Sequence, residues 1–384
     1  MLVIVQRVFR QVSNIVLMLV LSQSISEVQF VLFYNLTTSA AILSVIATFG
    51  IDAQLQKNLT DSTARLAHIG KFNNFKFRSS ISISLVAFFI CFYILHDVAF
   101  ALIFSMLIIV QCFLTHFENL LYLLSRYSKD LFRYSLIIFV FFFIKLLIIY
   151  ETMEIKLLLI FLILEMLTLI FFSLKLNKEL AVLNSNSNDI KFFISDNITN
   201  TLIEFFAMII LRLPQYLTSA YGFYEFSKLI IIIQKPIEFL LVLTSQWYKQ
   251  KFKNLKNLIT IGADLNRIKL KIICLLSILA VTLNVVFNLI PTELILEEKH
   301  IMTFFVMSVI VITHSYLNLL RQINNMLGKY RVNLIGYMSY TCFAFCFCYI
   351  GIKTNSLELI SSSLGCAGCL TLFPMELLMR RRSQ

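Results

Sequence analysis

The sequence has too few polar residues to cover a soluble domain of its length. Charged residues make up 14% of the 384 residues, whereas 59% are hydrophobic, and the mean hydropathy is +0.84. A soluble chain this long would fold into two or three domains with polar surfaces, so this composition excludes that class. Only nine glycines and four prolines interrupt the apolar runs. The composition therefore indicates an all-α integral membrane protein built from long lipid-facing helices.

The motifs of common enzymes are missing as well. There is no glycine-rich phosphate loop, no HExxH and no nucleophile elbow, and the five histidines follow no metal-ligand spacing. Cys366 and Cys369 form a CxxC pair, but their neighbours offer no polar groups to support a metal or redox site. All the cysteines lie in apolar segments and are interpreted as small hydrophobic residues. We therefore expect no catalytic residues, no metal site and no cofactor.

Apolar runs long enough to cross a bilayer recur twelve times. The first contains Arg7 and Arg10 and lacks a small-residue cleavage site, so we expect a membrane helix there and no cleaved signal. An even number of spans places both termini on the same side. The predicted spans cover residues 3–22, 28–49, 79–95, 98–120, 134–150, 157–175, 192–212, 223–246, 269–290, 301–320, 333–352 and 358–379.

Lysines and arginines lie mainly in alternate connections between these spans. The positive-inside rule then predicts that both termini are cytoplasmic. The external connections are all short, with about ten residues in the longest, which leaves no room for an external catalytic domain. The internal segments 50–78 and 247–268 are longer and basic, and we expect amphipathic helices there on the anionic inner surface. The few basic residues on the external side are Lys156, Arg212, Lys299 and Lys353.

A polar stretch, LNSNSNDIK at 183–191, separates six spans from six. It predicts two six-helix lobes, residues 1–183 and residues 184–384. Two short matches fall at equivalent places in the halves, namely LSRY with LGKY after the fourth and tenth spans and FYNL with FYEF in the second and eighth. They favour parallel repeats, as found in transporters.

The eighth span, residues 223–246, carries four charges and Pro236 within an apolar run. A lysine near the bilayer centre costs about 2.5–3.5 kcal/mol, so these charges should face a partner or a watered cavity. We expect this helix to form one wall of a polar cavity in a transporter. At 100° per residue, its polar face carries Tyr221, Tyr224, Glu225, Lys228, Lys235 and Glu238, and its apolar face carries Ile230, Ile233, Ile237, Leu240 and Leu241.

Other spans also place polar residues on one face. In the first span the stripe includes Arg7 and Arg10, for which anchoring by snorkelling is the alternative. In the seventh, Asp196, Asn200 and Glu204 follow at intervals of four residues. Weaker stripes, in the ninth and tenth spans, are expected to make interhelical hydrogen bonds. Their residues are Asn284 and Asn288, and His314, Asn318 and Gln322.

Two isolated charges lie inside the fifth and sixth spans. Glu165, near a span centre, is a functional candidate that is either paired with a lysine or protonated. Lys145 lies toward the outer end of its span, where it can snorkel outward. Glu118, near the inner end of the fourth span, lines a cavity or lies at the interface.

One known family resembles this chain along most of its length. The likeness rests on residues 21–59 with their TFGID ending and basic inner loop, on LSRY and LGKY, and on the passage from Arg212 to Lys228 leading into FYEFSKL. In these features the chain resembles the Wzx flippases of O-antigen and other polysaccharides. They belong to the multidrug, oligosaccharidyl-lipid and polysaccharide (MOP) exporter superfamily.

The resemblance implies a MATE-like fold, a V-shaped pair of six-helix lobes that opens alternately to the cytoplasm and the periplasm. It implies transport of undecaprenyl-pyrophosphate-linked oligosaccharides across the bacterial inner membrane during lipopolysaccharide O-antigen biosynthesis. Membrane lipids and other polysaccharide assembly proteins are the expected partners, and nucleic acid is not. Proton or sodium coupling is left open. The head-group candidates are Arg7, Arg10, Lys228, Lys235, Arg212 and Lys145, and the candidates for ion coupling or charge balance are Glu165, Asp196, Glu204, Glu225 and Glu238.

Two alternatives remain open. A cation-coupled antiporter of drugs or organic cations would share the fold but favour an acidic cavity, whereas these spans mix both signs. A membrane polysaccharide polymerase would need a large periplasmic loop, which the short external connections do not provide.

Overall fold

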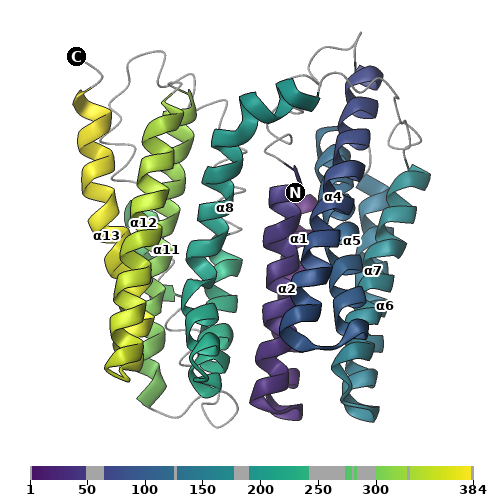
Figure 1. Cartoon of the computed structure of the whole chain (residues 1–384), viewed down its shortest axis with the longest axis horizontal. Coiled ribbons are helices and arrows are strands. Elements are labelled where there is room, and N and C mark those ends of the chain that lie inside the picture. The colour runs from purple at the N-terminus through teal and green to yellow at the C-terminus, as the bar shows by residue number, and fades with distance from the viewer. Residues whose placement is uncertain are drawn as a thin grey trace. The chain divides into compact units, whose positions relative to one another are not determined.

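The computed structural model consists of helices throughout the residues that it describes (Figure 1). These are residues 2–48, 65–124, 128–176, 190–241, 273–278, 281–282, 299–326 and 329–381. The chain divides into two compact units, Met1–Phe205 and Phe206–Gln384. The predicted boundary between residues 183 and 184 lies outside the described residues and stays a prediction.

The N-terminal unit is a bundle of antiparallel helices. α5 lies against α2, α4 and α7, while α1 packs on α6 and α6 on α7. α8 starts in this unit and continues into the next. The helices are α1 (Leu2–Ser24), α2 (Glu27–Thr48), α4 (Arg65–Leu95), α5 (Val98–Leu124), α6 (Ser128–Glu151), α7 (Ile155–Leu176) and α8 (Ile190–Ala220).

The C-terminal unit combines the second part of α8 with a helix over residues 224–241 and a packed group of three further helices. In that group α13 packs on both α11 and α12. Residues 273–278, within the predicted ninth span, are also helical. The bounds of the three helices are α11 (Lys299–Met326), α12 (Tyr330–Lys353) and α13 (Leu357–Arg381).

Eight helices in the described part are long and apolar enough to cross a membrane. They confirm the predicted second to seventh, eleventh and twelfth spans. The predicted first and tenth spans are helical too, and so are residues 224–241 of the eighth. The eight segments are Glu27–Thr48, Asn73–Leu95, Val98–Glu118, Arg133–Glu151, Ile155–Lys175, Ile198–Ala220, Tyr330–Lys353 and Leu357–Glu376.

Two predicted loops are wrong in part. Residues 65–78 were predicted as an inner-surface segment but form the start of α4, continuous with the third span. The predicted external loop at 213–222 is helical as far as Ala220, although Pro214 lies inside it. Pro214 has no backbone N–H to donate to the helix, but its carbonyl accepts a hydrogen bond from the Thr218 hydroxyl at 2.7 Å. Arg212 therefore lies within a helix and not in an external connection.

The other connections that the structure describes at the predicted external side are as short as the sequence indicates. The turn between α4 and α5 holds only His96 and Asp97. The Asp97 carboxylate caps α5 by accepting hydrogen bonds from the backbone N–H groups of Ala99 and Phe100 at 2.8 and 3.1 Å. The Lys156 ammonium group, 2.7 Å away, is the main reason why the pKa of this carboxyl is lowered, and the two backbone donors add to the effect.

The junction of α12 and α13 depends on a glycine. A Cβ atom on Gly351 would lie 2.8 Å from the backbone nitrogen of Ile360, so one of the two helices must shift. Gly351→Ala should therefore lower the free energy of unfolding by about 1–3 kcal/mol, as overpacked sites do. Gly365→Ala is the matched control, because its Cβ would lie 3.6 Å from the nearest atom. Thermal unfolding of the purified chain in detergent measures both. Equal midpoints for the two variants would contradict this account of the junction.

Candidate functional site

The helix at 224–241 has the two faces predicted for the eighth span. Ile230 and Ile233 are fully buried, and Ile237, Leu240 and Leu241 are buried as well. On the opposite face Tyr224 and Glu225 are exposed, while Lys228, Lys235 and Glu238 are half-buried. The face with the charges is thus the more accessible one, as a cavity wall requires.

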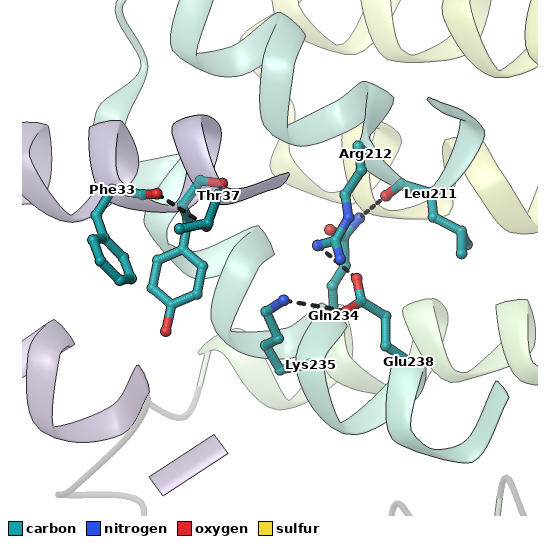
Figure 2. Close-up of polar contacts among 8 residues, drawn as sticks. Phe33, Thr37, Leu211, Arg212, Gln234, Lys235 and Glu238 are labelled. Atoms are coloured by element: carbon teal, nitrogen blue, oxygen red, sulfur yellow. Dashed lines mark hydrogen bonds and ion pairs between the residues drawn. The ribbon is translucent and has the colours of Figure 1, made fainter. Parts of the chain in front are cut away.

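Three charged side chains meet where this helix passes α8 (Figure 2). One Glu238 oxygen, Oε1, lies 2.6 Å from Nη1 of Arg212. The other, Oε2, accepts a hydrogen bond from Nζ of Lys235 at 3.2 Å. The side chains of all three are about 15% exposed. We call Arg212, Lys235 and Glu238 the charged triad.

Neutral hydrogen bonds fix the two helices beside the charged triad. The Gln234 amide donates to the Leu211 carbonyl at 2.7 Å, next to Arg212 in sequence (Figure 2). Two turns earlier, the Ser227 hydroxyl donates to the Gln215 carbonyl at 3.1 Å. Both donors are buried. These bonds tie the helices at two levels, so Arg212 and Glu238 are held opposite each other.

The charged triad carries one positive charge more than it carries negative charge. Glu238 uses both carboxylate oxygens, one for each cation. An unbalanced charge in a low-dielectric setting is costly unless an ion of opposite sign approaches it. Of the two contacts of Glu238, the one with Lys235 is the longer.

In the N-terminal unit, Lys145 of α6 pairs with Glu165 of α7. Nζ of Lys145 donates to Oε2 of Glu165 at 2.6 Å, and the two side chains are only 7% and 5% exposed. The prediction that Lys145 can snorkel outward is therefore wrong. Of the two alternatives for Glu165, the structure shows pairing with a lysine. This pair is electrically balanced.

Arg10 of α1 has a carboxylate partner in the same unit. Its Nη1 donates to Oε1 of Glu118 at 2.7 Å, and the Tyr134 hydroxyl of α6 donates to the same oxygen at 2.6 Å. Arg10 thus joins α1 to α5 instead of only anchoring a helix end. This pair is balanced as well. The side chain of Arg7, one turn earlier, lies outside the described residues.

The other predicted site residues differ in how far they are buried. Glu204 and Lys228 are half-buried, and Glu225 is exposed. Asp196 lies on α8 one turn before Asn200, but its side chain lies outside the part that the structure describes, as do Asn284 and Asn288. Asn318 makes the interhelical hydrogen bond predicted for its stripe, because it accepts from the Tyr337 hydroxyl of α12 at 2.9 Å.

Several polar contacts have no counterpart in the sequence-based predictions. Tyr134 and Gln234 were not among the predicted site residues. Tyr134 contacts Glu118, and Gln234 contacts Leu211, the neighbour of Arg212. A third group lies between α4 and α5, where Nε2 of His116 and Oδ1 of Asn73 are 2.6 Å apart. Lys76, one turn after Asn73, is fully buried. The only signal in the sequence was the polarity of residues 73–78, which were assigned to an internal loop.

Solved transporter structures share this arrangement of helices over nearly the whole chain. An inward-facing multidrug resistance MATE family transporter of the MOP superfamily superposes with a TM-score of 0.60 at 11% identity, covering 97% of this chain and 94% of that one. The chain has the fold of the MATE transporters. An outward-facing MATE family transporter matches this fold with a TM-score of 0.59 at 11% identity, over 99% and 94% of the two chains. The predicted all-helical, MATE-like membrane fold is therefore confirmed.

A further structure with the MATE fold is a MOP superfamily transporter from Pyrococcus furiosus. It is described as having a binding pocket of reverse polarity that suggests a different function. It matches with a TM-score of 0.55 at 12% identity, over 99% of this chain and 94% of that one. No protein-family model and no curated protein matches the sequence.

Proposed function

We propose that this chain is a flippase that moves lipid-linked oligosaccharides across the bacterial inner membrane by alternating access. The observation that carries the proposal is the charged triad, in which two half-buried cations share one carboxylate. The cargo would be an oligosaccharide repeat unit on undecaprenyl pyrophosphate, destined for O-antigen or a related surface polysaccharide. The MATE fold, which is known in inward-facing and outward-facing conformations, supports the alternating mechanism.

The distribution of charge supports an anionic cargo. In the N-terminal unit, Arg10 and Lys145 each have a carboxylate of their own. In the C-terminal unit the charged triad keeps a surplus positive charge. A diphosphate offers several acceptor oxygens to such a site, and charge-assisted hydrogen bonds are strong when water is largely excluded. The Pyrococcus furiosus transporter, which is described as having a binding pocket of reverse polarity, supports the view that pocket polarity differs among proteins with this fold.

Within this proposal, Glu238 balances the two cations between transport cycles. An arriving phosphate group would take over Lys235, while Glu238 keeps its shorter contact with Arg212. Arg7, Lys228, Asp196, Glu204 and Glu225 are further candidates around the transport path, and Glu165 remains one for proton or sodium coupling. Both termini would be cytoplasmic, in keeping with the basic connections. Other polysaccharide assembly proteins would receive the cargo.

A drug or organic-cation antiporter is the second candidate, since multidrug transporters share the fold. Such a cargo is cationic and would be repelled by the surplus charge of the triad. A polysaccharide polymerase has less support, because the described connections on the predicted external side are turns of a few residues.

Deleting the gene in the source bacterium tests the proposal. Lipid-linked repeat units should accumulate on the cytoplasmic side of the membrane, surface polysaccharide should disappear, and expression of the chain should reverse both effects. Extraction of undecaprenyl-linked glycans, with enzymatic labelling of the externally accessible fraction, measures the outcome. Unchanged glycans combined with greater sensitivity to cationic drugs would instead establish the antiporter.

A further inference from the structure

A second cation in the C-terminal unit, Arg321, makes no ion pair with a carboxylate among the described residues. Arg321 lies on α11, five residues before the helix ends at Met326. It is half-buried, and its Nε atom is buried without a hydrogen-bond acceptor among the described residues. No ion pair found in that part of the chain includes Arg321, in contrast to Arg10, Lys145 and the charged triad.

Polar residues of α12 hold Arg321 in place. The Arg321 guanidinium lies beside the Tyr337 hydroxyl. This hydroxyl in turn donates to Oδ1 of Asn318 at 2.9 Å. The Asn333 amide donates to the Arg321 backbone carbonyl at 3.1 Å and accepts from the Asn324 amide at 2.8 Å. Arg321 is thus positioned by neutral partners, none of which cancels its charge.

On this face of α11, Arg321 and Asn318 keep hydrogen-bond donors that the described residues do not use. Asn318 uses its oxygen for Tyr337, which leaves its amide N–H groups for another acceptor. Asn318 precedes Arg321 by three residues, so the two side chains lie on one face. His314, one turn earlier on that face, is 4% exposed, and its Nδ1 has no partner among the described residues. Guanidinium and amide donors together suit a ligand that only accepts, such as a phosphate group.

We propose that Arg321 and Asn318 bind the phosphate group of a lipid headgroup, at a site separate from the charged triad. The basic connections predict that this end of α11 is cytoplasmic, which is where anionic phospholipids and the diphosphate of a lipid-linked substrate are both present. Basic sites between membrane helices on this side are known to bind lipid headgroups. A merely snorkelling arginine would expose its guanidinium to water, whereas Nε of Arg321 is buried.

The test uses the full chain purified in neutral detergent and carrying Lys235→Ala, which weakens the charged triad. Titration calorimetry with inorganic pyrophosphate, and with micelles containing phosphatidylglycerol, should show binding to this protein. Adding Arg321→Met should weaken binding about ten-fold or more, since it removes a charge-assisted contact. Tyr337→Phe, which keeps every charge but removes the group that positions Arg321, should weaken it several-fold.

Arg331→Met is the matched control, because Arg331 is an exposed arginine at the start of α12 and should leave binding unchanged. If phosphatidylglycerol does not displace bound pyrophosphate, the ligand of this site is the diphosphate of the substrate. If phosphatidylglycerol displaces pyrophosphate, the ligand is a membrane phospholipid. The proposal is overturned if neither probe binds, or if both bind equally well with Arg321 or Tyr337 replaced. These readouts are independent of which cargo the chain transports.

Discussion

Lys235→Ala should reduce export of surface polysaccharide by about 10- to 100-fold while the protein remains in the membrane. Without Lys235, Arg212 and Glu238 form a balanced pair that no longer attracts an anion. The size of the effect follows from losing one hydrogen bond to a charged group, which contributes roughly 1.5–3 kcal/mol. Labelling of surface polysaccharide, normalised to the amount of the chain in isolated membranes, measures the loss.

Two further variants separate the charge of Lys235 from its bulk and from surface charge in general. Lys235→Arg keeps the cation and should retain most of the export. Lys353→Ala removes an exposed lysine of the same unit, which packs over the rings of Tyr221 and Tyr349, and should export normally. Normal surface polysaccharide in cells carrying both Lys235→Ala and Lys228→Ala would refute the cavity assignment.

Lys145→Met should destabilise the N-terminal unit by about 3–5 kcal/mol, because it leaves the Glu165 carboxylate buried without a counterion. Glu165→Met should destabilise the unit by a similar amount, because it leaves the Lys145 ammonium group buried without a counterion. The double variant Lys145→Met/Glu165→Met should regain most of the lost stability, since a well-packed apolar pair often replaces a buried ion pair at little cost. The free energies of unfolding of the three purified variants in detergent, compared with that of the wild-type chain, test this prediction.

The double variant also tests the role of Glu165 in transport. Normal export by this stable variant would show that the pair is structural, whereas loss of export would assign Glu165 to coupling. A double variant no more stable than either single one would contradict the view that the charges mainly balance each other.

Helical periodicity was enough to predict the two faces of the eighth span. Ile230, Ile233 and Ile237 are buried because residues three or four apart lie on one side of any helix, whatever surrounds it. The same periodicity placed Lys235 and Glu238 on a common face, and they are in contact. The all-helical membrane class followed from the length of the apolar runs, since only helices and closed barrels satisfy the backbone in lipid, and barrel strands are short and alternate in hydrophobicity.

The partners of the charges could not be predicted, because they depend on which helices become neighbours. Arg10 meets Glu118 across 108 positions of sequence, and nothing local to either residue indicates the other. Lys145 was expected to snorkel because it lies near a helix end, but Glu165 on the adjacent helix offers a closer partner than water. Arg212 was placed at the outer end of the seventh span, whereas α8 continues past it to Ala220.

The central claim is that the C-terminal unit holds an anion at Lys235, and binding to the purified full chain tests it most directly. Undecaprenyl pyrophosphate and the organic cation tetraphenylphosphonium would be titrated into the wild-type chain and into Lys235→Ala. We predict that the diphosphate binds the wild-type chain, that Lys235→Ala weakens this binding about 10- to 100-fold, and that the cation does not bind. Tight binding of the cation, together with diphosphate binding that does not depend on Lys235, would contradict the account.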